Sequence, residues 1–566
     1  MTLRAQLGLL ALGFALAACG AAAEDAGAAG ADEEPSNFRD GGAGEGPQEP
    51  GARAEACAFD DDCADGYVCF GGQCIFQGTD ALPPPDGADA GPREEEVDFV
   101  QYGRPAAGRA QVFVASPQTD SVVRIHAETL AIGVIEVGDE PTELYAVPGE
   151  DTVVVLNHTS DELAIVTAED TGDSVRLIAL PYHFNALTLD PAGRFAFCWF
   201  DLSRALPGED GSAVQDVAVV DLAGGAVSPV AVGFRPRRVG FTADGRIALV
   251  VTEDGVSVID PAALDGPTAA RTVPVAPDVF RQADREVILS PDGAFAASRG
   301  PGEPGVTLVE LAEGVPRFVP LGAVPTDLDL LPDGRTALAV LRSIGQLALV
   351  PMDTAAADPE TIRFVDLAGR QVGAAVADAA GEVAVLYTTV AGAPPRLTLL
   401  DLTTEALVDL PLRKGVRGVA LDPSGGVAFV LHDKAEGDPA AAPTEADLIA
   451  RSDGYSLVDL RTGFVKLQTT PAEPFGLVFA PDRPLAMVLL ADPARRVASV
   501  QRIDLAAFDV RDRPLGSTPE AAGLLPAVER AFVTQTHPEG RISFIPLDGE
   551  GRVETVSGYT LNGRIE

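Results

Sequence analysis

The chain has 566 residues, and 84 Asp and Glu against 41 Lys and Arg give it a net charge of −43. A surface this acidic repels nucleic acid and anionic lipid headgroups, so we exclude both as main binding partners. A chain of this length has room for several domains.

Residues 1–18 are typical of a secretory signal peptide, because one Arg precedes an apolar run too short for a membrane span. A buried helix is the alternative, and the low-complexity sequence that follows argues against it. The stretch from Leu16 to Cys19 resembles a bacterial lipobox. This resemblance implies lipidation of Cys19, and Gly20 after it implies sorting to the outer membrane. We therefore expect an exported protein that is lipid-anchored to the outer membrane and either periplasmic or surface-exposed.

Residues 19–56 are acidic and rich in Ala, Gly and Pro, which predicts a disordered tether, and residues 76–96 form a Pro-rich linker. Between them, residues 57–75 hold Cys57, Cys63, Cys69 and Cys74. An exported chain meets an oxidising environment, so we expect two disulfides rather than the alternative, a zinc site. The segment resembles small cysteine-rich modules of secreted bacterial proteins. That resemblance implies pairing of the first cysteine with the third and the second with the fourth, whereas the spacing alone leaves three pairings open.

Residues 97–566 repeat one pattern: a short alternating strand, a turn rich in Asp, Pro and Gly, and a second strand. PTDLDLLPDGRTALAVL from Pro325 is its clearest copy, and a third strand such as GVTLVEL and a weaker fourth follow. The turn glycines are 41 to 52 residues apart: Gly149, Gly193, Gly245, Gly293, Gly334, Gly381 and Gly425. Four short antiparallel strands at this period predict an all-β fold of β-propeller blades rather than a β-sandwich.

About ten such units fit between Val97 and Glu566, which predicts either one large ring or two smaller propellers. The P-D-G-R turn and the later V-x-V-I-D strand resemble bacterial YVTN-type and lactonase-like propeller repeats. This resemblance implies the fold and leaves the function open, since such folds carry many activities. Cys198 lies in the apolar run FAFCWF, and we expect it to be a buried thiol without a chemical role.

Two long insertions interrupt the repeats, Asp201–Gln215 and His432–Gly454. Both lie between the second and third strands of a unit, and such loops share one face of a propeller with the connections between blades. The short P-D-G-R turns occupy the opposite face. Because long loops on a rigid scaffold usually carry binding functions, we expect the face with the insertions to be the functional one.

Three arginines, Arg237, Arg285 and Arg417, open inner strands and are expected at the channel mouth on this face. Together they are candidates for binding a carboxylate or phosphate group. The alternative is that each pairs with a neighbouring carboxylate such as Glu143, Asp284, Glu286 or Asp327.

No H-x-x-x-H, H-E-x-x-H, G-x-S-x-G or Walker motif occurs, so the motifs predict no catalytic residue, metal ligand or cofactor. We expect a scaffold that binds an envelope or extracellular protein, peptide or glycan. The alternative is a lactonase-like or other metal-dependent hydrolase. Resemblance to lactonase-like enzymes would give it a divalent metal in the channel, with His183 as the histidine placed for that role.

Overall fold

The computed structural model describes residues 67–70, 73–76, 103–169, 172–209, 211, 213–276, 285–358 and 360–559. The predicted signal peptide, Cys19, the tether, the linker after Phe76, Cys57 and Cys63 lie outside these ranges. The hairpin of β1 (Tyr67–Phe70) and β2 (Gln73–Phe76) belongs to a separate unit, and its register places Cys69 opposite Cys74. The disulfides and their connectivity stay predictions.

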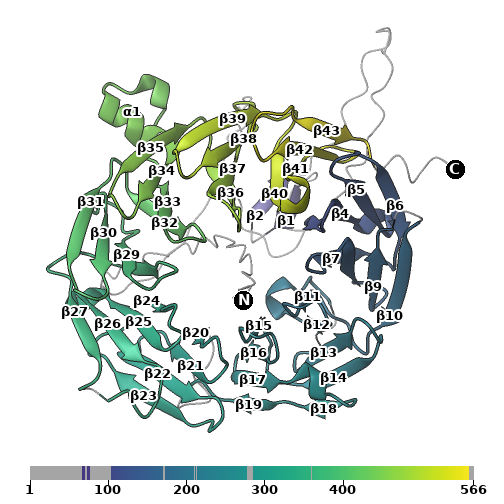
Figure 1. Cartoon of the computed structure of the whole chain (residues 1–566), viewed down its shortest axis with the longest axis horizontal. Coiled ribbons are helices and arrows are strands. Elements are labelled where there is room, and N and C mark those ends of the chain that lie inside the picture. The colour runs from purple at the N-terminus through teal and green to yellow at the C-terminus, as the bar shows by residue number, and fades with distance from the viewer. Residues whose placement is uncertain are drawn as a thin grey trace, which may run out of the picture. The chain divides into compact units, whose positions relative to one another are not determined.

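Ten antiparallel sheets form a single ring, with the first strand of each sheet nearest the centre (Figure 1). The first five blades in chain order are β3 (Ala106–Ala107), β4 (Gln111–Ser116), β5 (Ser121–His126) and β6 (Ile132–Glu136); β7 (Pro141–Ala146), β8 (Thr152–Asn157), β9 (Glu162–Thr167) and β10 (Ser174–Ala179); β11 (Ala186–Leu189), β12 (Phe195–Trp199), β13 (Asp216–Asp221) and β14 (Val227–Ala231); β15 (Arg238–Phe241), β16 (Ala248–Thr252), β17 (Gly255–Ile259) and β19 (Arg271–Val273); and β20 (Glu286–Leu289), β21 (Phe295–Arg299), β22 (Gly305–Glu310) and β23 (Pro316–Pro320).

The remaining five blades are β24 (Asp327–Leu330), β25 (Thr336–Leu341), β26 (Gln346–Pro351) and β27 (Arg363–Asp366); β28 (Ala374–Ala377), β29 (Val383–Tyr387), β30 (Arg396–Asp401) and β31 (Leu407–Pro411); β32 (Val416–Leu421), β33 (Val427–His432), β34 (Asp453–Asp459) and β35 (Val465–Thr470); β36 (Pro474–Phe479), β37 (Leu485–Asp492), β38 (Val497–Asp504) and β39 (Asp509–Pro514); and β40 (Pro519–Leu525), β41 (Arg530–Gln535), β42 (Arg541–Pro546) and β43 (Glu554–Ser557). The predicted propeller is confirmed, and its ten blades belong to one ring rather than two.

The core lies between neighbouring blades, because the two middle strands of each sheet are apolar on both faces. In β8 all six residues are buried, and β4 shows the same pattern. Cys198 in β12 is fully buried with a free thiol, as predicted, and burial raises its pKa. A short extra strand, β18 (Thr268–Ala269), pairs in parallel with β14 of the preceding blade and makes that sheet five-stranded. No helix in the described part of the chain is long and apolar enough to cross a membrane.

The recurring turn between the first and second strands has the backbone that its sequence predicts. All seven turn glycines adopt a positive φ, between 65° and 77°. In the turn at Gly334, Asp333 Oδ1 accepts hydrogen bonds from the backbone N–H groups of Arg335 and Thr336, at 2.8 and 2.9 Å. A side chain other than hydrogen at these glycine positions is strained, which explains why glycine recurs there.

Cations on the outermost strands connect neighbouring blades. Lys466 Nζ in β35 donates to the carbonyl oxygen of Phe508, in the turn between β38 and β39 of the next blade, at 2.6 Å. The same contact, from an outer-strand cation to the turn between the third and fourth strands of the next blade, recurs at five other junctions: Arg176 to Ala223, Arg271 to Ala312, Arg317 to Thr354, Arg363 to Leu402, and Arg513 to Gly549. We call these contacts the rim clamps.

Candidate functional site

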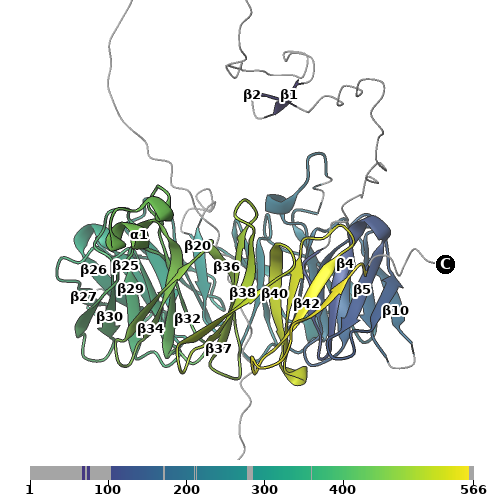
Figure 2. The same cartoon turned by 90° about the horizontal axis from the view of Figure 1, so that it is seen from above.

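Both insertions emerge on the same face of the ring, which we call the insertion face. The first lies between β12 and β13 and the second between β33 and β34, so each follows the second strand of its blade. The short helix α1 (Glu445–Arg451) of the second insertion lies on the upper side of the ring in Figure 2. The second insertion is shorter than predicted, because His432 ends β33 and Asp453 begins β34.

The helix α1 was not expected from the repeat pattern, but local sequence explains it. Thr444 is the N-cap, and its hydroxyl oxygen accepts a hydrogen bond from the backbone N–H of Asp447 at 3.1 Å. Glu445 and Asp447 stand in the first turn and Arg451 in the last, which matches the helix dipole.

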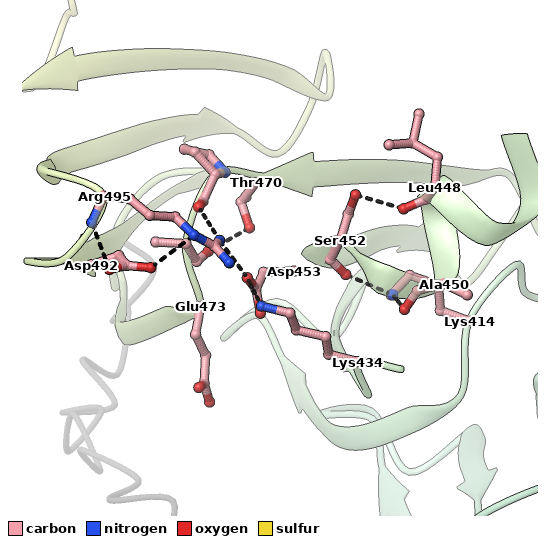
Figure 3. Close-up of polar contacts among 12 residues, drawn as sticks. Lys414, Lys434, Leu448, Ala450, Ser452, Asp453, Thr470, Glu473, Asp492 and Arg495 are labelled. Carbon is pink, nitrogen blue, oxygen red and sulfur yellow. Dashed lines mark hydrogen bonds and ion pairs between the residues drawn. The ribbon is translucent and has the colours of Figure 1, made fainter. Parts of the chain in front are cut away.

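Lys414 fastens this helix to the ring. The residue is 4% exposed, and its ammonium donates to the carbonyl oxygens of Ile449, Ala450 and Ser452, at 2.7, 3.0 and 2.8 Å. Lys434 also pairs with Asp453 at 2.7 Å, and Arg495 of the next blade approaches the same carboxylate, as Figure 3 shows. The second insertion is therefore ordered and anchored to the ring, because three backbone carbonyl oxygens accept from all three ammonium N–H groups.

The three predicted arginines do not meet; each pairs with its own carboxylate. Arg237 bonds Glu253 at 2.9 Å, and Arg417 pairs with Glu473, both at exposed positions. Arg285 makes a bidentate contact with Glu303, with both distances 2.8 Å, and its side chain is only 1% exposed. Each arginine therefore forms an ion pair with a nearby carboxylate, which was the alternative to ligand binding. The carboxylates are not the ones that we expected.

Arg285 also donates to the hydroxyls of Ser298 and Thr307. A buried guanidinium with a bidentate carboxylate and two hydroxyl acceptors has its donors directed into the protein. Ligand binding by Arg237, Arg285 and Arg417 stays a prediction.

His183 lies in the connection between β10 and β11 and meets residues that no sequence motif links to it. Its Nε2 is 3.1 Å from Glu209 Oε1, and its Nδ1 is 2.8 Å from Asp161 Oδ1. His158, which follows β8, directs its own Nε2 to the same Glu209 oxygen at 2.7 Å. The two imidazole rings are edge to face, with centroids 4.4 Å apart. We call His158, His183 and Glu209 the histidine cluster.

Glu209 belongs to the first insertion and is held by its own turn. Its Oε2 accepts the backbone N–H of Leu206 at 2.5 Å, which leaves Oε1 directed at the two rings. Burial works against its charge, but this bond and the two histidine contacts lower its pKa. Burial likewise opposes the charge on His183, yet its bonds to Asp161 and Glu209 together raise its pKa. The cluster therefore favours a carboxylate at Glu209 and added positive charge beside it.

A cavity of about 430 Å³ opens on the insertion face at the blade of β28–β31, lined by the connection from β27 to β28 and by β29, β30 and the loop between them. Arg370 and Arg396 line it together with Tyr387 and Thr398. Arg370 Nε lies 2.8 Å from Asp409 Oδ1, and Arg396 lies 3.7 Å from the other oxygen of that carboxylate. The hydrogen bond from Arg370 contributes most to lowering the pKa of Asp409. Two arginines sharing one carboxylate leave this cavity with an excess of positive charge, and its size suits a small ligand group.

Sequence reasoning selected His183 and missed His158, Glu209, Arg370 and Arg396. These residues come from different loops, so no fixed spacing connects them. Their positions in the repeat do give a signal. His158 and Glu209 lie in loops after a second strand, Arg370 lies in a connection between blades, and Arg396 begins a third strand. Residues in those positions share the insertion face.

No protein-family model matches the chain, and no curated protein does. Solved structures give distant matches. They include hydrazine synthase from Kuenenia stuttgartiensis, with 16% identity, a TM-score of 0.28 and coverage of 56% of this chain and 96% of that one. A eukaryotic initiation factor has 12% identity, a TM-score of 0.47 and coverage of 79% and 96%. The dihydro-heme d1 dehydrogenase NirN, in complex with DHE, has 15% identity, a TM-score of 0.38 and coverage of 64% and 73%. None of these similarities carries an argument about function.

Proposed function

We propose that the protein is a lipid-anchored envelope scaffold that binds a protein, peptide or glycan through its insertion face. The anchor rests on the lipobox resemblance at Cys19. The choice of face rests on a contrast between the two sides of the ring. On one side the turns between first and second strands are short and near-uniform, whereas the other side has two insertions and a cavity. Shape and charge that differ from blade to blade are what selective recognition needs.

The observation that carries the proposal is that both insertions are held in place by the ring. Lys414 holds the end of α1, and the histidine cluster holds the first insertion at Glu209. Each insertion also exposes a large apolar side chain, Leu206 at 61% and Leu448 at 44%. Pre-ordered loops lose little conformational entropy on binding, so they suit a recognition surface.

The test places a photo-cross-linking amino acid at Leu206 or Leu448, and as matched control at Arg246 or Arg335 in the opposite turns. Cells are irradiated and cross-linked products identified by mass spectrometry. We expect Leu206 and Leu448 to capture the same partner and the turn positions to capture none. Partner capture from the turn positions alone would show that recognition takes place on the opposite face and would refute the proposal. Fatty-acid labelling of the wild type but not of Cys19→Ser would support the anchor independently.

Loss of the second insertion gives a further check. Residues 433–452 are replaced by a four-residue turn, and Lys414→Met is added because its three carbonyl acceptors disappear. Lys414→Met alone, with the insertion intact, is the control for stability. We expect the shortened protein to fold. With the cross-linker at Leu206, it should no longer capture the partner that Leu448 captures in the full-length protein. If the shortened protein keeps that product, the second insertion takes no part in recognition.

The hydrolase alternative has one observation in its favour, which is that His183 meets a second histidine and a carboxylate. These residues lie at the junction of the second and third blades. They support a metal-binding site there, and by themselves they support no particular reaction.

A further inference from the structure

We infer that His158, His183 and Glu209 form a binding site for one divalent transition-metal ion of the Zn²⁺ class. One ligand atom from each residue, an imidazole nitrogen or a carboxylate oxygen, lies within 4.8 Å of the other two. The inference is independent of the proposed binding function, since a metal site here requires only the geometry of these loops.

Three separate loops of the insertion face supply the ligands. His158 follows β8, His183 connects the second blade to the third, and Glu209 comes from the insertion of the third blade. The Nε2 atoms of the two histidines lie 2.7 and 3.1 Å from Glu209 Oε1, so both rings already point to one place. Ligands around zinc stand about 2.0–2.2 Å from the ion. A small separation of these three groups would therefore admit an ion between them.

The far side of the His183 ring is arranged as in known metal sites. Its Nδ1 lies 2.8 Å from Asp161 Oδ1, so this nitrogen carries the proton and donates to the carboxylate. In the structure Nε2 faces Glu209, and an ion placed between these two groups would displace the proton from Nε2 and receive its lone pair. Metal-binding histidines usually donate their second ring N–H to a carboxylate or carbonyl in this way. On the other ring, His158 Nδ1 lies 3.6 Å from Glu140 Oε2, which adds a second carboxylate behind the ligands.

The charge of the site favours a cation. Glu209, Asp161 and Glu140 converge on two imidazoles, and within the described residues none of these carboxylates has an ion pair with Lys or Arg. The nearby Arg204 instead pairs with Glu143 and Asp201. A divalent ion would neutralise this excess of negative charge.

The ligand set also selects the kind of ion. Imidazole nitrogens suit Zn²⁺, Co²⁺, Ni²⁺ and Cu²⁺, whereas Ca²⁺ and Mg²⁺ prefer oxygen ligands alone. Two histidines and one glutamate provide three protein ligands and leave a further position for water or for a group of a bound partner. The side chains of His158, His183 and Glu209 are 12%, 20% and 6% exposed, so the site is sheltered but reachable from solvent.

The experiment uses the full-length protein without reductant, stripped of metal with a chelator and titrated with Zn²⁺ by calorimetry. We expect one equivalent to bind at this site, with Ca²⁺ in excess failing to compete. Co²⁺ should give the visible absorption of a site with nitrogen ligands. Bound metal should also slow proteolysis around Leu206, because Glu209 ties the first insertion to the blade junction.

Variants assign the ion to its ligands. We expect Glu209→Gln and His183→Ala each to lower the Zn²⁺ affinity at least 100-fold, and Asp161→Asn to lower it about 10- to 100-fold. His537→Ala is the matched control, because His537 also follows the second strand of its blade and lies outside the cluster. It should bind Zn²⁺ as the wild type does.

Two results would overturn the inference. One is Zn²⁺ binding that survives in Glu209→Gln and His183→Ala, which would place the ion elsewhere, for example at the cysteine module. The other is binding only at millimolar Zn²⁺ with no change in proteolysis, which would leave the cluster as a hydrogen-bonded network. Neither result bears on the cross-linking experiment, so the two proposals fail separately.

Discussion

At the scale of single residues, His432 shows how a histidine on the insertion face can be wholly structural. It ends β33, is 5% exposed and has both ring nitrogens engaged. Nδ1 lies 3.0 Å from the carbonyl oxygen of Gly415 and so carries the proton, while Nε2 accepts from the hydroxyl of Ser456 at 2.7 Å. Burial, together with the charge of Lys414, lowers its pKa to about 4.

This shift predicts a loss of stability in acid. Below its usual pKa of about 6.5, His432 gains a proton in the unfolded chain but not in the folded one. The free energy of unfolding should therefore fall by about 3 kcal/mol through this residue as the pH drops from 7 to 4, and level off below that. His432→Gln lacks a titrating ring, so its denaturant midpoint should fall less over this range. Parallel curves for wild type and variant would refute the assignment.

At the scale of elements, the rim clamps give the outer strands a specific contact. The fourth strands are exposed: β10 has one buried residue and β39 has none. Among the described residues, neither of these two strands has a further strand paired to its outer edge. A cation on such a strand that donates to a turn carbonyl of the next blade therefore links the two blades at the rim. Three of the chain's cations are Lys, and Lys466 serves in such a clamp.

We expect Lys466→Met to lower the free energy of unfolding by about 1–2 kcal/mol, because a charged donor to a backbone carbonyl is lost. Arg511→Met is the matched control on the neighbouring outer strand. Arg511 pairs with Asp509 two residues away, and both are about half exposed, so its loss should cost less than about 0.5 kcal/mol. Equal midpoints in denaturant for the two variants would show that the clamp adds no stability.

At the scale of the whole molecule, the ring closes where its first blade meets its last. Val112 and Val114 of β4 pack against Phe532 of β41 and Phe544 of β42 in one buried cluster. Each of these two blades consists of consecutive strands, and within the described residues neither gives a strand to the other. Side-chain packing between these blades therefore carries the closure. By contrast, β18 joins the third and fourth blades through backbone pairing.

We predict that Phe544→Ala opens this seam first. The substitution leaves a cavity that costs about 3–5 kcal/mol, and faster amide exchange should appear in β4, β5, β41 and β42 before other strands. Phe197→Ala is the control, because Phe197 is equally buried at the junction that β18 bridges. Its faster exchange should stay within the third and fourth blades. Uniform exchange around the ring in both variants would contradict a weak seam.

The repeat pattern was enough to predict the propeller, its four-stranded blades and the positive φ of its turn glycines. Those features depend on neighbours in sequence: alternation decides which faces a strand buries, and a turn needs a residue that tolerates its backbone. The faces of the ring also followed, because strand directions alternate within a blade. The repeat pattern did not predict the helix α1. It also misplaced the ends of that insertion, because the strands β33 and β34 continue into sequence that resembles a loop.

The sequence by itself could not decide between one ring and two, because ten similar repeats are compatible with both. Packing between the first and last blades decides it. The sequence likewise could not join His183 to His158 and Glu209, or direct Arg285 to Glu303. Such contacts depend on the distance between loops of neighbouring strands and blades, and that distance is fixed only when the blades pack. Local geometry can therefore be predicted from the sequence, whereas contacts between side chains of different loops are decided only by the tertiary structure.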